Sequence, residues 1–134
     1  MSAPAPVSRF VFDDEALDDV PTGYLRVDMP ADIAGSDDVF AAVDTAHSLP
    51  EYAGTNWDAL LDVLSDPSWL DAEGLALVHR VWPPAMTASV LRTYLTVLGH
   101  VIDRLNSRTT ISLLAIFPTD AEASYHEATS PVPG

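Results

Sequence analysis

Three aspartates recur at four-residue spacing in the middle of the chain: Asp58, Asp62 and Asp66. If the segment is helical, residues four apart lie on one face on successive turns, so the carboxylates form a ladder. Like charges at this spacing destabilise an isolated helix by roughly 0.2–0.5 kcal/mol per pair. Asp58 recovers part of that cost in the first turn, where the helix dipole favours an anion. Asp62 lies mid-helix with no Lys or Arg four residues away. Such acids suit an external cation, and the alternative is a solvated polar face.

The segment 56–66 has the pattern of an amphipathic helix. Asn56 is a favourable N-cap residue at its start. At about 100° per residue, three apolar side chains share the face opposite to the acids and are expected in the core: Leu60, Val63 and Leu64. Trp57 and Leu61 fall at the border between the two faces. The helix would therefore bury one face and present acids beside an indole on the other.

No arrangement typical of catalysis or of metal binding occurs in the sequence. The histidines have no metal-ligand spacing: His47, His79, His100 and His126. His100 and Asp103 lie one turn apart on a predicted helix, which is more typical of a local hydrogen bond than of catalysis. Gly-rich phosphate loops and nucleophile elbows are not found. We therefore predict no catalytic residue, no cofactor and no metal, and a protein that is not an enzyme.

The elements that would position this helix alternate between strand and helix patterns. Residues 24–29 alternate apolar and polar side chains and stop at a proline, and residues 75–81 have the pattern of a second strand. Residues 111–116 form a third and are nearly all apolar, as in a strand covered on both faces. Strands joined by helical crossovers pair in parallel. The sequence thus predicts a compact α/β domain with a three-stranded parallel sheet packed with helices. Residues 9–12 are a candidate extra edge strand at the N-terminus.

Two further helices are expected to pack on this sheet. One begins at Ser36, whose hydroxyl suits an N-cap, and its apolar residues form a buried stripe: Val39, Phe40 and Val43. The other is a long helix after Pro84, and Asn106 is expected to end it. Its apolar residues recur at three- and four-residue spacing: Leu91, Tyr94, Leu95, Leu98, Ile102 and Leu105.

The charge balance points to a basic partner. Twenty Asp and Glu face six positive residues, all arginine, giving a formal net charge of −14 over 134 residues. Nucleic acid and anionic membranes bind through cationic groups, so both are poor direct partners. A basic protein is the natural one, because complementary fields speed encounter. The alternative is that the acidity only keeps the protein soluble.

The length corresponds to one domain with two flanking arms. We predict an N-terminal arm at 1–22 that includes the candidate edge strand, an α/β domain at 23–118, and a C-terminal tail at 119–134. The first residues lack the basic and apolar stretches of a signal peptide, and the apolar run 111–118 is too short to span a bilayer. The sequence contains no cysteine. These features predict a cytoplasmic protein.

The segment 49–64 reads Leu-Pro-Glu-Tyr-Ala-Gly-Thr-Asn-Trp-Asp-Ala-Leu-Leu-Asp-Val-Leu. This run resembles the signature of the barstar family, the intracellular inhibitors of barnase-like ribonucleases. Outside it, the order of elements over 24–116 is similar to that of the barstar fold. The resemblance implies a ribonuclease inhibitor whose loop and helix plug the enzyme's active site, with carboxylates taking the place of the RNA phosphates.

Position by position, the resemblance implies roles for residues of this segment. Asp62 would be the central carboxylate for the phosphate pocket, and Asp58 a second acid beside it. Tyr52 would be an aromatic contact from the loop. Gly54 and Asn56 would shape the turn and cap the helix. The implied partner is a basic secreted microbial ribonuclease, bound 1:1 by a protein that is a monomer when free.

Several contact positions depart from the family pattern or match it less closely. Ala53 stands where the family often has a second aromatic residue. Leu61 replaces a tryptophan, and Trp57 stands where an aliphatic residue is usual. Asp103, near the end of the long helix, falls where the family carries another interface acid. Because these differences lie on the contact rim, the partner could be a diverged ribonuclease. The alternative is a barstar-like immunity or regulatory protein that binds a different basic protein.

Overall fold

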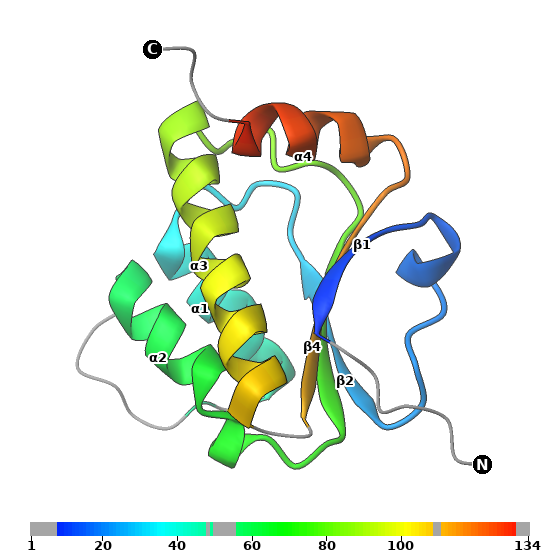
Figure 1. The fold of residues 1–134 in the computed structure, drawn as a ribbon, viewed down its shortest axis with the longest axis vertical. Coiled ribbons are helices and arrows are strands. Elements are labelled where there is room, and N and C mark those ends of the chain that lie inside the picture. The colour runs from blue at the N-terminus through cyan, green and yellow to red at the C-terminus, as the bar shows by residue number, and fades with distance from the viewer. Residues whose placement is uncertain (1–7, 48, 50–55, 109–110, 131–134) are drawn as a thin grey trace.

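The sheet has four parallel strands and confirms the predicted α/β class. The computed structural model describes residues 8–47, 49, 56–108 and 111–130. The strands lie in the order β1-β4-β3-β2 (Figure 1). Their bounds are β1 (Arg9–Phe12), β2 (Tyr24–Met29), β3 (Gly74–His79) and β4 (Ser112–Phe117). The candidate N-terminal edge strand is therefore present, and it pairs in parallel with β4.

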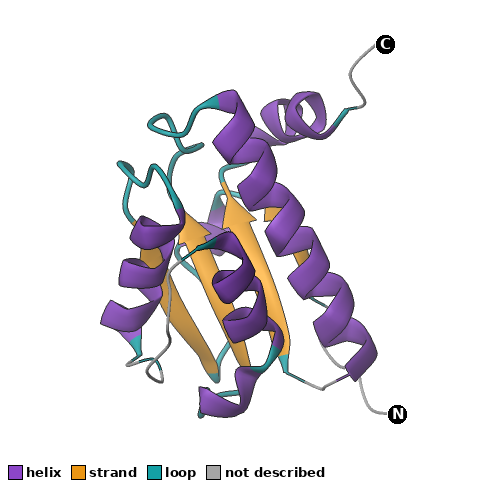
Figure 2. Cartoon of the chain, turned by 90° about the vertical axis from the view of Figure 1, so that its left-hand side faces the viewer, coloured by secondary structure: helices purple, strands orange, loops and turns teal. Residues whose placement is uncertain are grey.

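Three helices lie on one face of this sheet: α1 (Ser36–Ala46), α2 (Trp57–Ser65) and α3 (Ala88–Arg108). The fourth, α4 (Ala121–Thr129), lies across one end of the sheet beside α3 (Figure 1). Figure 2 shows α1, α2 and α3 as a layer in front of the strands. Short 3-10 turns are η1 (Glu15–Leu17) and η2 (Pro67–Trp69). The strands β2 and β3 are joined through α1 and α2, and β3 and β4 through α3, so each parallel pair is connected by a helical crossover.

The two central strands are buried on both faces, which explains why their sequence is almost entirely apolar. All residues of β3 and β4 are buried. One set of side chains packs under the helices, and the other packs around Leu17 of η1. The second set consists of Ala76, Val78, Leu114 and Ile116. The turn at η1 thus covers the face of the sheet that the helices leave open.

The start of α1 differs from the prediction. The helix begins at Ser36, but its N-cap residue is Gly35, which has no side chain to accept a capping hydrogen bond. Asp38 reaches back instead, and its Oδ2 accepts a hydrogen bond from the Ala34 N–H at 2.7 Å. An acid three residues into a helix can satisfy a backbone donor before the first turn. The expected cap at Ser36 is therefore replaced by the carboxylate two residues later.

The long helix also differs at its end. Asn106 does not stop α3, which continues to Arg108. The Asn106 Oδ1 accepts a hydrogen bond from the Ser8 N–H at 2.8 Å, and its Nδ2 donates to the Ser8 carbonyl at 3.1 Å. An amide side chain can imitate the hydrogen-bonding edge of a backbone. Asn106 therefore anchors the residue that leads into β1.

The C-terminal segment, predicted to be a tail, contains α4. Tyr125 accounts for this difference: its ring centroid lies 4.9 Å from that of Phe10 and 5.1 Å from that of Phe12. Ala121 is buried at the start of the helix. Tyr125 thus packs an otherwise small and polar segment on β1, and α4 also contacts α3. The division into a central domain and arms stays a prediction, although both arms contribute packed elements.

Candidate partner-binding face

The helix that carries the acids begins where the sequence predicts. The Asn56 Oδ1 accepts a hydrogen bond from the Ala59 N–H at 2.8 Å, and the Asn56 carbonyl accepts one from the Leu60 N–H at 3.0 Å. The backbone of Asn56 is extended, as an N-cap requires. α2 therefore has a defined first turn that starts at Trp57.

One face of α2 is fixed in the core. Leu60 and Val63 are 0% exposed and Leu64 is 2% exposed. The helix packs mainly against α3 and also touches α1 (Figure 1). Near its C-terminal end, the Trp69 Nε1 donates a hydrogen bond to the Val63 carbonyl at 2.9 Å. The predicted buried stripe is thereby confirmed, and the outer face of the helix has a fixed direction.

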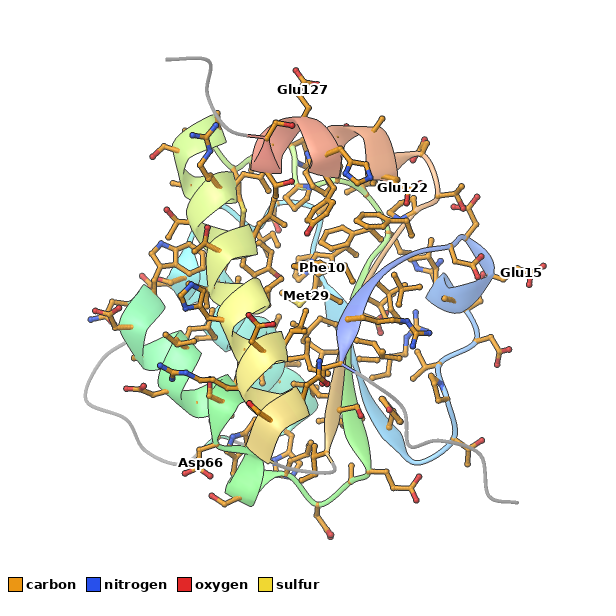
Figure 3. All side chains as sticks on the ribbon, in the orientation of Figure 1. Phe10, Glu15, Met29, Asp66, Glu122 and Glu127 are labelled. Atoms are coloured by element: carbon orange, nitrogen blue, oxygen red, sulfur yellow. The ribbon has the colours of Figure 1, made fainter. Side chains whose placement is uncertain are left out.

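The opposite face presents the acids to solvent. Asp58, Asp62 and Asp66 are all exposed, and Figure 3 shows Asp66 at the edge of the molecule, pointing away from the sheet. Within the described part of the chain, neither Asp58 nor Asp62 has a hydrogen-bond or ion-pair partner for its side chain. Asp66 Oδ1 accepts one long hydrogen bond from the Ser68 N–H at 3.4 Å. The fold therefore makes no use of the first two carboxylates.

The arginines that form ion pairs lie elsewhere. Arg26 pairs with Asp28 at 2.9 Å on β2, and Arg80 pairs with Asp18 at 2.6 Å after β3. The Arg80 guanidinium holds the pKa of the Asp18 carboxyl below its usual value, through a hydrogen bond and through its charge. Neither pair touches α2. The outer face of α2 is thus left with negative charge.

The structure describes some of the predicted rim residues. Trp57 and Leu61 are half-buried and pack against the core from the border of α2. Tyr52 and Gly54 lie outside the described residues. Their roles in binding stay predictions, as do those of the acids.

Asp103 lies on a different helix from the acids of α2. It is exposed on α3, about two and a half turns after Tyr94. That offset places it on the side of α3 opposite to Tyr94, the residue against which Trp57 packs at a ring-centroid distance of 5.8 Å. A partner would have to cover the outer faces of both helices to reach it. Its place in an interface stays a prediction.

Sequence reasoning missed a buried polar pair beneath α2. The His79 Nδ1 lies 3.0 Å from the Ile116 carbonyl oxygen, and its Nε2 lies 2.7 Å from the Tyr94 hydroxyl. Because a carbonyl only accepts, Nδ1–H donates to it and Nε2 accepts from the tyrosine. Burial lowers the pKa of His79 to about 4 and raises the pKa of Tyr94. The available signal was an ionisable residue inside an apolar strand pattern.

We expect mild acid to destabilise the protein through His79. The unfolded chain protonates this imidazole at a pKa near 6.5, whereas the folded chain keeps it neutral down to about pH 4. Stability from this group is therefore complete above about pH 6.5 and falls by up to about 3 kcal/mol as the pH drops to 4. Urea unfolding at several pH values measures this loss, with the exposed-site variant His100→Gln as control. A flat profile between pH 6.5 and 4.5 contradicts the assignment.

Comparison with known proteins identifies a family match. A family model described as Barstar (barnase inhibitor) matches residues 24–115. The matched region runs from β2 into β4 and contains the whole of α1, α2 and α3. No curated protein and no solved structure matches the chain.

Among the described residues, no helix has the length and apolar character to cross a membrane, and no group of three acid, histidine or cysteine side chains is placed to hold a metal ion.

Proposed function

Because the chain belongs to the barstar family, we propose that it is a proteinaceous inhibitor that blocks the active site of a barnase-like, guanyl-type microbial ribonuclease. One observation supports this most: Asp58 and Asp62 are exposed on one face of α2 and unpaired within the described residues. A ribonuclease must bind phosphate with cationic side chains. Carboxylates of matching geometry form short, charge-assisted hydrogen bonds to such groups.

The proposed interface is centred on the middle of α2. Asp62 is the central carboxylate and Asp58 the second, with Trp57 and Leu61 at the rim. Tyr52 and Gly54 contribute from the preceding loop, Asn56 holds the first turn, and Asp103 contributes from α3. The protein acts as a 1:1 binder in the cytoplasm, with neither enzyme activity nor a cofactor. The net charge of −14 fits a basic partner and disfavours nucleic acid.

A stoichiometric titration tests this function. Purified protein is added to a panel of guanyl-type microbial ribonucleases, barnase among them, and RNA cleavage is followed. We expect activity to fall to zero near a 1:1 ratio for at least one enzyme. If none is inhibited at stoichiometric levels, the function is wrong. A basic non-ribonuclease protein that binds tightly would then favour the alternative, an immunity or regulatory role on the same scaffold.

We expect the association rate to depend steeply on salt. Charge-steered association is established for barnase and barstar, so the question is whether this chain shares it. The rate constant should fall by about tenfold or more between roughly 20 mM and 500 mM ionic strength, because exposed charges are screened over a few ångströms at high salt. The dissociation rate should change little. Stopped-flow measurements at a series of salt concentrations decide this, and equal sensitivity of both rates would argue for a mainly apolar interface.

A further inference from the structure

A chain of side-chain contacts connects the acid-bearing helix to the centre of the sheet. Trp57, the first residue of α2, lies with its ring centroid 5.8 Å from that of Tyr94 on α3. The Tyr94 hydroxyl donates to the His79 Nε2 at 2.7 Å. The imidazole of His79 in turn stacks on Phe117 of β4, with centroids 4.1 Å apart and planes 13° from parallel. The contacts thus run from an exposed helix to both central strands.

The buried hydrogen bond holds the Tyr94 ring in one place. Tyr94 is 0% exposed and His79 is 1% exposed. Moving the ring away would leave a buried donor and a buried acceptor without partners, which is more costly than the loss of an exposed hydrogen bond. The second imidazole nitrogen is also engaged, by the Ile116 carbonyl at 3.0 Å. The Tyr94 ring beneath Trp57 is therefore held by a chain of buried hydrogen bonds.

The first turn of α2 rests on this ring. Trp57 and Leu60 are the large side chains of that turn that pack on the core. Leu60 points inward along the buried stripe, whereas Trp57 lies at the border, immediately before Asp58. Because Trp57 and Asp58 are adjacent on one helical turn, a shift of that turn after loss of the indole contact would carry the Asp58 carboxylate with it.

We propose that Trp57 is a positioning residue: its indole, supported by Tyr94 and His79, fixes the first turn of α2 and so the direction in which Asp58 is presented. The claim that Trp57 affects binding through Asp58 rests on the proposed function. The claim that Trp57 stabilises the first turn of α2 applies to the free protein and does not. The two parts are tested separately.

Hydrogen exchange in the free protein tests the first turn. The reporters are the amides of Ala59 and Leu60, which donate to Asn56. In Trp57→Leu we expect these amides to exchange about tenfold faster, a change of the size that coupled neighbours produce, with β4 amides unchanged. Trp57→Phe keeps a ring on Tyr94 and should restore near wild-type rates. Unchanged rates in Trp57→Leu overturn the inference. If that variant loses β4 protection as well, Tyr94→Phe replaces it, and unchanged first-turn rates there overturn it equally.

A double-mutant cycle tests the effect on binding. Trp57→Leu should weaken ribonuclease binding about tenfold when Asp58 is present, but less than about twofold in an Asp58→Asn background, because positioning matters only while the carboxylate is there. A merely structural loss would give the same factor in both backgrounds, and this additive result overturns the positioning role. If the wild-type protein inhibits no ribonuclease, the proposed function fails, while the exchange measurement still decides the role of Trp57 in the first turn.

Discussion

Asp62→Ala is expected to weaken ribonuclease binding more than any other single alanine substitution in the chain. In the free protein this carboxylate is exposed and has no partner among the described residues, so its removal costs the fold nothing. In the complex it would leave the cations of the phosphate pocket buried without an anion. Truncating one member of such a pair costs about 2–5 kcal/mol, which raises the Kd by roughly 30- to 5,000-fold.

The matched control for this substitution is Asp120→Ala. It makes the same change in net charge at an exposed position before α4, away from α2. We expect its effect on the Kd to be within about threefold, because a distant exposed charge contributes only to steering. Calorimetric or kinetic titration of both variants gives the comparison. If Asp62→Ala binds as well as wild type, the role of central carboxylate that the family resemblance implies for Asp62 is wrong.

Asp62→Asn separates binding from folding at the same position. Removing the middle one of three like charges spaced a turn apart should leave the free energy of unfolding unchanged or raise it by a few tenths of a kcal/mol, roughly 0.2–0.5 for each pair relieved. Thermal and urea unfolding of the free protein measure this. A loss of more than about 1 kcal/mol would mean that the carboxylate makes an internal hydrogen bond, and the functional interpretation of this face would lose its main support.

The features that the sequence predicts well are those fixed by neighbours in the chain. Asn56 caps α2 because its side chain needs only an amide three residues on. The buried stripe and the acid ladder of α2 follow from helical periodicity, which is a property of the segment itself. The parallel order of the strands follows from the helices between them. Local chemistry therefore determines most of the candidate face.

The features that the sequence does not predict depend on distant partners. Asn106 is a residue type that often ends a helix, yet its side chain hydrogen-bonds to the backbone of Ser8. The sequence around these two residues does not predict that pairing. Tyr125 packs the polar C-terminal segment against Phe10 and Phe12 of β1, which lie more than a hundred residues earlier in the chain. In the same way, the distance between Asp103 and the acids of α2 depends on how α2 and α3 pack. Such contacts require the fold to be known first.

A substitution on the buried face of α2 is expected to have the opposite effects to Asp62→Ala. Leu64 is 2% exposed and belongs to the main hydrophobic cluster. Leu64→Ala removes buried methyl groups and leaves a cavity that the surrounding helices fill only in part. We expect the free energy of unfolding to fall by about 2–5 kcal/mol. The carboxylates on the outer face keep their exposure, so the fraction that remains folded should bind the ribonuclease with nearly wild-type affinity.

Urea unfolding and ribonuclease titration of the same Leu64→Ala preparation measure both quantities. For the unfolding measurement alone, the matched control is Leu61→Ala, because Leu61 is half-buried at the border of the same helix and its truncation should cost less stability. The pair Asp62 and Leu64 then separates the two faces of α2: one substitution affects binding without stability, and the other affects stability without binding. If Leu64→Ala lost affinity in its folded fraction by as much as Asp62→Ala, the two faces would not be independent. The acids would then owe their binding geometry to the packing of the whole helix.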